Sequence, residues 1–300
     1  MADAQPYDDR DGFIWMDGEM VPWNDAKLHV LTHGLHYASS VFEGERAYGG
    51  EIFKLTEHTE RLFESARIMG FEIPFTVQEI DDACRQVMQA NGLVDCYVRP
   101  VAWRGSGEMG VSARKAGVRV AVCAWEWGSY FDPAARLKGI RLARAEYRRP
   151  DPATIPAKAK AAGLYMICTL EKHRAEDAGF ADAMMLDWRG HIAECTGANI
   201  FFIKDGAIHT PTPDCFLDGI TRRTVIDLAR ARGIEVTERT ILPDELESFS
   251  ECFITGTAAE VTPVSQIGDV HYQPGRICED LLNDYMAAVT PGTVPQAKAG

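Results

Sequence analysis

Two lysines occupy a segment of the chain where an amine could act as a nucleophile. Lysine is scarce, with nine residues against 22 arginines, and Lys158 and Lys160 stand in the segment Ile155–Tyr165 among alanine, glycine and proline. A lysine with small apolar neighbours is poorly hydrated, which favours the neutral amine that attacks a carbonyl carbon and forms an imine. The alternative is that both lysines are solvated side chains at the start of a helix.

An anion-binding helix end and a lone carboxylate accompany these lysines. Gly219–Arg222 opens a predicted helix, whose N–H groups and dipole favour a phosphate. The turn Thr255–Ala259 offers hydroxyl donors, and Glu194 ends a predicted strand before a tight turn at Gly197. Each feature alone also fits ordinary capping or turn chemistry. Together with a lysine they supply what pyridoxal phosphate requires, namely an amine for the imine, donors for the phosphate and an acid for the ring nitrogen.

A third pattern, Gly105–Gly110, matches the glycine spacing of a dinucleotide-binding loop. Such a loop needs a helix directly after it, because the helix N-terminus holds the pyrophosphate. Here the strand-like residues Val118–Val122 follow instead. The glycines therefore predict a flexible loop and not a nucleotide site.

Three histidines form the other candidate cluster. His29, His33 and His36 lie four and three residues apart, so a helix would place them on one face, where they could bind zinc. Gly34 and the strand-like flanks oppose a helix, and no Glu follows His29 to complete a His-Glu-x-x-His motif. We expect structural or surface histidines and no metal, and a histidine-cluster metal-binding protein remains a distant alternative.

Composition limits the classes of partner. The chain has 300 residues, room for about two domains, and its 46% hydrophobic and 25% charged residues exclude general disorder. The formal net charge of −13 argues against nucleic-acid and anionic-membrane partners, which need a basic surface. No apolar run reaches the roughly 18 residues of a membrane span, and no signal-peptide core follows the N-terminus. The eight scattered cysteines lack a Cys-x-x-Cys pair, so we expect buried, reduced thiols in a cytoplasmic protein.

The first half of the chain predicts an antiparallel α+β arrangement, because hairpin signals and helical periodicity follow each other without βαβ alternation. The expected elements are a hairpin over Phe13–Val21 turning on Asp17-Gly18, strands at Val41-Phe42 and Ile52-Phe53 around Gly49-Gly50, a helix from the N-cap Thr56 to Gly70, a helix from the capping box Thr76/Glu79 to Gly92, and strands Cys96–Trp103 and Val118–Trp125.

The second half predicts many short strands with a few helices, which suggests a barrel-like sheet with helices outside. Its expected elements are a helix Ala161–Asp177, a hairpin Met184–Ile192, strands Asn199–Ile203 and Ala207–Thr210, a helix Thr221–Arg232, a strand Glu251–Thr255 and a helix Cys278–Met286. We therefore divide the chain into a small domain (1–125), an interdomain loop (126–137) and a large cofactor-binding domain (138–300).

Seven segments in order resemble the branched-chain amino acid aminotransferases, which belong to the fold-type IV group of pyridoxal-phosphate enzymes. The resemblance runs from about Phe13 to Met286, and seven matches in the family's order are far more specific than any one. It implies an α+β fold with a small N-terminal α/β domain and a larger C-terminal pseudo-barrel domain. The segments are His36–Gly44, Glu57–Leu62, Tyr97–Pro100, Lys160–Tyr165, Glu194–Phe201, Leu217–Arg222 and Thr255–Glu260.

The resemblance also implies roles toward pyridoxal 5'-phosphate. Lys160 and not Lys158 matches the Schiff-base lysine, because a tyrosine follows five residues later. Glu194 matches the partner of the pyridine nitrogen, and Tyr165 the group that bonds the phenolic oxygen. The residues that match the phosphate site are Arg61, Ile220, Thr221 and Thr257.

For the substrate, the resemblance implies a ping-pong transfer of the amino group from L-leucine, L-isoleucine or L-valine to 2-oxoglutarate. A D-amino-acid or (R)-amine transaminase of the same fold is the main alternative, and a lyase of this fold acting on aminodeoxychorismate is a more distant one. The loop Gly107–Val111 matches one that reaches the neighbouring subunit, which implies a homodimer or higher homo-oligomer. The implied substrate-binding residues are Tyr37, Phe42, Tyr97, Arg99, Trp127, Tyr130, Thr257 and Ala258.

Glu45 departs from the family pattern, since relatives often carry an apolar residue at this position. We expect its carboxylate to face water, where it would have no effect on substrate range.

Overall fold

A computed structural model describes residues 5–128, 138–290 and 292 of the chain. By its internal packing the chain divides into two units, which are described separately below. The first comprises Met1–Gly128 and Ala159–Gly163, and the second comprises Ser129–Lys158 and Leu164–Gly300. Residues 129–137 of the expected interdomain loop lie outside the described residues, so the domain limits drawn from the sequence stay a prediction. In the described part of the chain, no helix has both the length and the apolar character needed to cross a bilayer.

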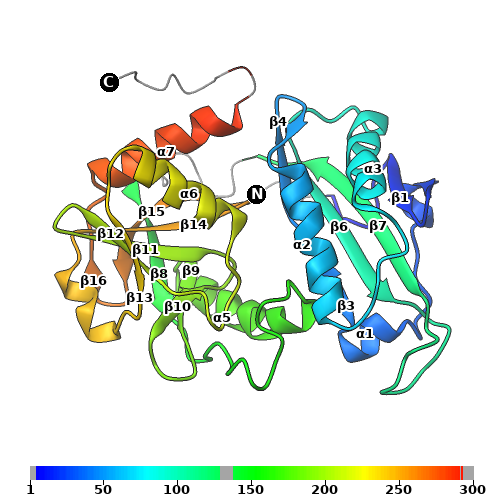
Figure 1. Cartoon of the computed structure of the whole chain (residues 1–300), viewed down its shortest axis with the longest axis horizontal. Coiled ribbons are helices and arrows are strands. Elements are labelled where there is room, and N and C mark those ends of the chain that lie inside the picture. The colour runs from blue at the N-terminus through cyan, green and yellow to red at the C-terminus, as the bar shows by residue number, and fades with distance from the viewer. Residues whose placement is uncertain (1–4, 129–137, 291, 293–300) are drawn as a thin grey trace. The chain divides into compact units, whose positions relative to one another are not determined.

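The first unit is built on a seven-stranded antiparallel sheet (Figure 1). Its order is β2-β1-β7-β6-β4-β5, and β3 also pairs with β6. The predicted hairpin is confirmed, because Asp17 and Gly18 both have positive φ, as a tight two-residue turn requires. The strands are β1 (Phe13–Met16), β2 (Glu19–Pro22), β3 (Ser40–Phe42), β4 (Glu45–Tyr48), β5 (Glu51–Ile52), β6 (Cys96–Arg104) and β7 (Val118–Glu126).

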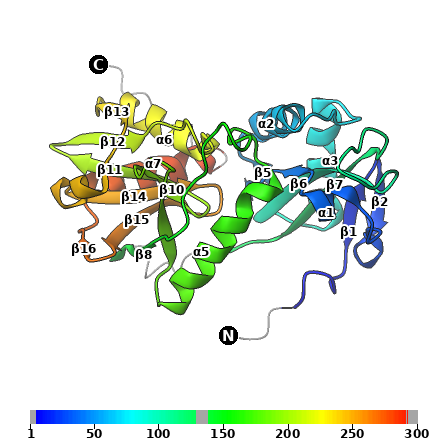
Figure 2. The same cartoon turned by 90° about the horizontal axis from the view of Figure 1, so that it is seen from below.

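Two amphipathic helices, α2 (Leu55–Ile68) and α3 (Val77–Ala90), pack together on one face of this sheet (Figures 1 and 2). The capping box of α3 is confirmed, since the Glu79 backbone N–H donates to Thr76 Oγ1 at 3.2 Å and the Thr76 N–H donates to Glu79 Oε2 at 2.6 Å. The expected N-cap of α2 is wrong. Lys54 occupies that position, and the Thr56 hydroxyl lies inside the helix and donates to an Asp81 oxygen.

Shorter elements precede these helices. A 3-10 turn η1 (Trp23–Asp25) is followed by α1 (His33–Tyr37), a five-residue helix that the sequence argument did not expect. Gly34 is accommodated in α1 because its Cα faces Trp103, where a Cβ would come within 3.1 Å of the Trp103 Cβ. Helix α1 packs against β6, a contact between distant parts of the chain that local helix propensity does not predict.

The second unit holds a nine-stranded mixed sheet in the order β10-β9-β8-β15-β14-β11-β12-β13, with β16 paired to β15. The sheet curls, because its first strand β10 also packs against β11 and β12, which agrees with the expected barrel-like form. The strands are β8 (Ile140–Arg144), β9 (Asp182–Leu186), β10 (Ile192–Cys195), β11 (Asn199–Lys204), β12 (Ala207–Pro211), β13 (Val236–Arg239), β14 (Glu251–Gly256), β15 (Glu260–Ile267) and β16 (Val270–His271).

Helices cover this sheet, as Figure 1 shows for α6 and α7, and they match the predicted ranges within a few residues. The expected helix from Ala161 begins as a 3-10 turn and continues as an α-helix to Asp177. Strands β8, β13, β15 and β16 were not expected, and Pro263 is unusual in a strand such as β15, which lies inside the sheet. The helical elements are η2 (Ala162–Tyr165), α5 (Met166–Asp177), α6 (Ile220–Ala231), η3 (Pro243–Ser248) and α7 (Arg276–Val289).

The core between the first sheet and its helices contains two fully buried acids, Glu43 and Glu45. Burial opposes ionisation of Glu43, yet Arg61 and His58 outweigh it and hold the pKa of Glu43 well below its usual range. Glu45 shares this core with Cys84. Burial, with the nearby charges of Glu43 and Asp81, raises the pKa of Glu45 well above its usual range.

The expectation that Glu45 faces water is therefore wrong. Side chains alternate along a strand, so a residue of β4 that points to the helices is enclosed. The carboxyl group contributes neither to a solvent surface nor to substrate contact, and it stays protonated at the pH where surface carboxyl groups are ionised.

This burial predicts a pH-dependent cost. Between the ordinary pKa of a glutamate and the raised pKa of Glu45, the folded chain keeps a proton that the unfolded chain loses, so stability falls as the pH rises. In this range the free energy of unfolding falls by up to about 1.4 kcal/mol per pH unit, because only the unfolded chain has lost the proton. Glu45→Gln, which cannot ionise, should lose less stability than the wild type in urea unfolding as the pH rises above the ordinary pKa of a glutamate. Exposed Glu51→Gln is the control, and parallel curves for wild type and Glu45→Gln would contradict the assignment.

Candidate active site

Lys160 is held by its backbone within the first unit. Its N–H donates to Ser65 Oγ at 2.9 Å, and its carbonyl accepts the Phe42 N–H at 3.1 Å. The Lys160 ammonium nitrogen lies 5.0 Å from the centre of the Phe42 ring. Lys158, by contrast, is exposed, whereas Lys160 is half-buried. The structure thus places Lys160, and not Lys158, in a partly enclosed position against an aromatic ring.

Three aromatic rings line the sheet face opposite α2 and α3. The Tyr97 ring lies 5.2 Å from Trp125 and 5.1 Å from Trp127, centre to centre. Trp125 was not expected among these rings, whereas the expected Tyr37 on α1 is 45% exposed and stacks on His33 at 4.7 Å. Tyr130 lies outside the described residues. The rings form an apolar surface that suits an aliphatic side chain.

Arg99 lies across this aromatic surface. Its guanidinium carbon is 4.7 Å from the Phe42 ring centre and 5.2 Å from the Tyr97 ring centre, and its Nη2 donates to the Tyr97 hydroxyl at 3.2 Å. Its Nε is buried without a hydrogen-bond partner among the described residues. Gly44 permits this arrangement, because a Cβ there would overlap the Tyr97 hydroxyl. The site therefore offers a cation framed by rings, with a buried donor suited to a carboxylate.

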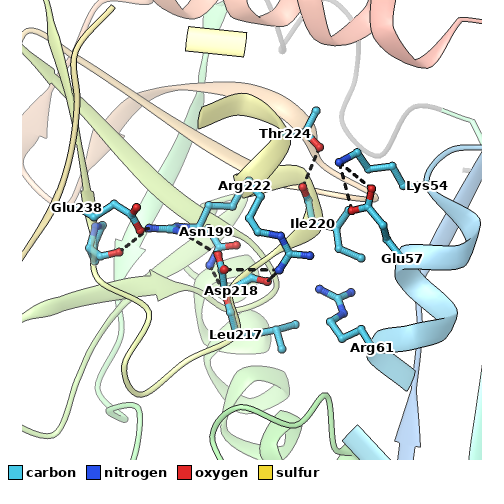
Figure 3. A network of polar contacts seen from close by, with 12 residues as sticks. Lys54, Glu57, Arg61, Asn199, Leu217, Asp218, Ile220, Arg222, Thr224 and Glu238 are labelled. Carbon is cyan, nitrogen blue, oxygen red and sulfur yellow. Dashed lines mark hydrogen bonds and ion pairs between the residues drawn. The ribbon is translucent and has the colours of Figure 1, made fainter. Parts of the chain in front are cut away.

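Arg61 on α2 is oriented by Glu43. Its Nε donates to Glu43 Oε1 at 2.7 Å and its Nη2 to Oε2 at 2.8 Å, so two of three guanidinium nitrogens hold a fixed carboxylate. His58 Nδ1 contacts the same carboxylate at 2.7 Å. At the N-cap of α2, Lys54 pairs with Glu57, which lies one turn before Arg61 (Figure 3). A bidentate pair fixes the plane of the guanidinium, which suits a residue that must present a defined edge to an anion.

In the second unit, Glu194 lies in β10 and is 9% exposed. Arg149 Nε is 3.2 Å from Glu194 Oε1, and Asn199 Nδ2 donates to Glu194 Oε2 at 3.4 Å. The sequence argument treated Glu194 as an isolated carboxylate and did not find Arg149. Tyr165, at the end of η2, is half-buried.

The N-terminus of α6 lacks a side-chain cap. Gly219 occupies the cap position, and no side-chain hydrogen bond is made to the first turn. The helix starts with buried Ile220 and Thr221. Arg222 does not serve the helix end, since it pairs with Asp218 at 2.8 Å and Glu238 at 2.7 Å (Figure 3). A helix start without a side-chain cap leaves backbone donors for an anion.

Asn199 connects these features within the second unit. Its Nδ2 donates to the Leu217 carbonyl at 3.0 Å (Figure 3), and a Cβ on Gly219 would overlap its Oδ1. In the sheet register it faces Thr255, which precedes the half-buried Thr257 and Ala258. The Thr255 hydroxyl is buried without a hydrogen-bond partner in the described part of the chain. Asn199 thus links Glu194 to the start of α6 through its side chain, and it links both to the hydroxyl-rich turn after Thr255 through its strand pairing.

The histidine cluster does not form a metal site. His33 Nε2 donates to the Gly110 carbonyl at 2.9 Å and His36 Nε2 to the Val30 carbonyl at 2.8 Å. Among the described residues, one group has metal-ligand atoms close together, namely Asp187, Asp214 and Cys215. Arg189 already pairs with the Asp187 and Asp214 carboxylates at 2.6 and 2.7 Å.

The loop Gly105–Gly110 leads into β7, and no helix starts there, as the sequence argument expected. No disulfide forms among the eight cysteines, and all but Cys123 are buried.

Comparison with known proteins agrees with these features. A family model described as "Amino-transferase class IV" matches residues 40–267. The chain belongs to the class IV aminotransferases. This membership confirms the family and the fold-type IV architecture expected from the sequence.

Several class IV relatives carry a more specific name. The "Branched-chain-amino-acid aminotransferase" of Pseudomonas aeruginosa is 42% identical over 297 residues, which covers 97% of both chains. A "Probable branched-chain-amino-acid aminotransferase" of Rickettsia bellii is 43% identical over 277 residues, 91% of this chain and 94% of the relative.

Solved structures agree. A T.th. branched-chain amino acid aminotransferase with pyridoxamine 5'-phosphate has a TM-score of 0.92 at 41% identity, covering 96% of this chain and 97% of its own. The same T.th. enzyme has been solved with N-(5'-phosphopyridoxyl)-L-glutamate and with 4-methylvaleric acid.

The site residues named from the sequence keep their roles as predictions. The structure brings Phe42, Tyr97, Arg99 and Trp127 together in the first unit. In the second unit it brings Glu194 close to the helix start through Asn199. Sequence reasoning missed Glu43, Arg149 and Asn199 as supporting residues. Glu43 and Asn199 stand inside the matched segments, whereas Arg149 lies outside them and carried no local signal.

Proposed function

We propose that this chain transfers the amino group of L-leucine, L-isoleucine or L-valine to 2-oxoglutarate, using pyridoxal 5'-phosphate. The observation that carries the proposal is the placement of Arg99 among aromatic rings, because such a site suits both an aliphatic side chain and a second carboxylate. The relatives' names support the substrate class. The two ligands solved with the T.th. relative, one built on glutamate and one on a branched aliphatic acid, have the same two chemical characters.

The residues fit the cofactor. The α6 start without a side-chain cap, the buried and unpartnered Thr255 hydroxyl and the buried Glu194 are donors and an acid of the kind that phosphate and pyridine nitrogen require. When bound, pyridoxal phosphate supplies a carbon for covalent attachment of the substrate amine and a ring that accepts electrons from the bond broken at Cα. The residues that would hold it are Arg61, Lys160, Tyr165, Glu194, Ile220, Thr221 and Thr257.

The chain's own groups then divide the work. With the cofactor bound, Lys160 Nζ would serve as the base for the Cα proton and then as the acid that returns it. Glu194 would hold a proton at the ring nitrogen, and Tyr165 would donate to the phenolic oxygen. The fixed backbone of Lys160 restricts where Nζ travels, which favours transfer between two defined carbon atoms.

The pocket residues set substrate range. Burial against Phe42, Tyr97 and Trp127 favours each added methylene by about 0.8 kcal/mol, which selects leucine over alanine. The Arg99 guanidinium would engage the second carboxylate of glutamate. One surface thus serves both substrates of the cycle.

Lys160→Ala should abolish covalent attachment of the cofactor, because the amine that attacks the aldehyde is gone. Lys158→Ala is the matched control and should retain it, since Lys158 is exposed. The measurement is borohydride reduction of the purified protein followed by peptide mass spectrometry, which locates the pyridoxyl group. A modified Lys158, or an unmodified wild type, would overturn the assignment.

Arg99→Met should separate the two substrates. Loss of the cation should raise KM for glutamate by at least about tenfold, equivalent to about 1.4 kcal/mol, with a smaller effect on leucine. Half-reactions with each amino acid, followed by absorbance, measure both constants, and exposed Arg85→Met is the control. Equal losses for the two substrates would count against a role in carboxylate recognition. Activity with D-alanine and none with L-leucine would replace the proposal by its main alternative.

We propose further that the protein is a cytoplasmic homodimer. Cysteines that form no disulfide suit a reducing compartment. The first unit exposes a group of apolar side chains on two segments, which the hydrogen bond between His33 and Gly110 joins. A group of exposed apolar side chains is typical of an interaction surface, whereas single ones are common on any protein. These side chains are Leu28, Val30, Leu31, Leu35, Met109 and Val111.

A charge in this surface should break the assembly. Light scattering should give the wild type twice the mass of one chain, or a higher even multiple, and Leu35→Asp with Val111→Asp should give a single chain. Leu242→Asp, exposed in the second unit, should leave the mass unchanged. A monomeric wild type would rule out the dimer.

A further inference from the structure

Arg149 is a buried cation that the sequence assigned no role. It is 4% exposed, and its backbone N–H donates to the Leu186 carbonyl at 2.7 Å. Its Nη1 lies 3.4 Å from the Leu164 carbonyl and 3.3 Å from Cys168 Sγ. Burying a guanidinium is costly unless it is paired, so its partner is informative. That partner is Glu194, at 3.2 Å from Nε.

The guanidinium connects two of the elements that carry expected cofactor groups in the second unit. Glu194 comes from β10, while Leu164 and Cys168 flank Tyr165 at the start of α5. Burial opposes the charge of Arg149 and is the largest single influence, but Glu194, Cys168 and Tyr165 together outweigh it, and the pKa of Arg149 is raised. The group therefore remains a cation inside the protein.

The contact with Glu194 is an ion pair and not an aligned hydrogen bond. Arg149 Nε lies within 4 Å of the carboxylate, yet its N–H does not meet hydrogen-bond geometry with any described group. Asn199 approaches the other oxygen at a long 3.4 Å. A buried cation 3.2 Å from the carboxylate favours a negative charge on Glu194.

A carboxylate that faces a pyridine nitrogen can share the proton in two ways. In a buried site, the neutral pair of carboxylic acid and pyridine avoids the cost of two charges. A fixed cation next to the carboxylate changes this balance, because it favours the anion and leaves the proton on the ring.

We propose that Arg149 is a positioning residue that keeps Glu194 ionised, so that the ring nitrogen of the cofactor keeps the shared proton. The inference rests on the proposed function. It assigns the electron-accepting state of the cofactor to a residue that does not touch it.

The test uses the holoenzyme loaded with pyridoxal phosphate that carries 15N in the ring, because the 15N chemical shift reports protonation of that atom. Arg149→Met, which removes the charge and keeps much of the volume, should move the shift toward neutral pyridine. Arg149→Lys, which keeps a charge, should stay near the wild type. Arg148→Met is the matched control, since Arg148 is the exposed neighbour. Cofactor affinity should fall about tenfold or more in Arg149→Met and less in Arg149→Lys.

An unchanged ring 15N shift in a folded Arg149→Met holoenzyme would overturn the proposal. Where that variant does not retain cofactor, Arg149→Gln provides a second neutral side chain. If neither neutral variant retains it, Arg149→Lys decides the matter, because a wild-type shift there supports the role of charge and a neutral shift refutes it. Failure of the wild type itself to bind the cofactor at Lys160 would refute the proposed function and not this inference.

Discussion

The side chain of Asn199 fixes the geometry of the second unit at the place where chemistry is expected. It donates to the Leu217 carbonyl before α6 and to Glu194, and it packs against Gly219. A shorter side chain would leave the Leu217 carbonyl without this donor. A Cβ on Gly219 would displace the amide and with it the start of the helix. The helix start and the carboxylate therefore keep one spacing because a single amide contacts both.

Buried charge follows a consistent rule in both units. Glu43 is paired with Arg61 and His58, and Glu194 is paired with Arg149. The pKa of Glu43 is held well below its usual range because Arg61 and His58 lie next to it, and each pair contains a residue with an expected role toward the cofactor. Glu45 forms no such ion pair within the described part of the chain, and its proton takes the place of a cation. In both pairs the acid contacts a second group besides the guanidinium. This agrees with the high cost of removing charges from water, which a buried ion pair seldom repays in stability alone.

The sequence predicted local features well. The hairpin at Asp17-Gly18, the capping box at Thr76 and the helix starting near Thr221 depend on neighbours within a few residues, and all three were found. Helix α1 and strand β15 depend on distant partners, namely Trp103 under Gly34 and the strands that flank Pro263, so local reasoning missed them.

The same distinction applies to the site. The cofactor residues were named because they stand in contiguous motifs, whereas Arg149 reaches Glu194 across 45 positions of chain, and no spacing rule links them. The prediction that Glu45 faces water was wrong because the helices that cover it come from other parts of the sequence. A charged side chain on a short strand looks exposed until the helices that cover that face are placed.

A site that accepts both leucine and glutamate must bind a carboxylate without excluding a hydrocarbon. A lysine at position 99 would hold a tight hydration shell, and an aliphatic side chain would have to displace it. The guanidinium of Arg99 is planar and weakly hydrated, and it lies against the Phe42 and Tyr97 rings. Its faces therefore extend the apolar surface, while its edges carry the N–H groups that a carboxylate needs. Under the proposed function, dual recognition would require no movement of the arginine, because the two substrates would use different parts of one rigid group.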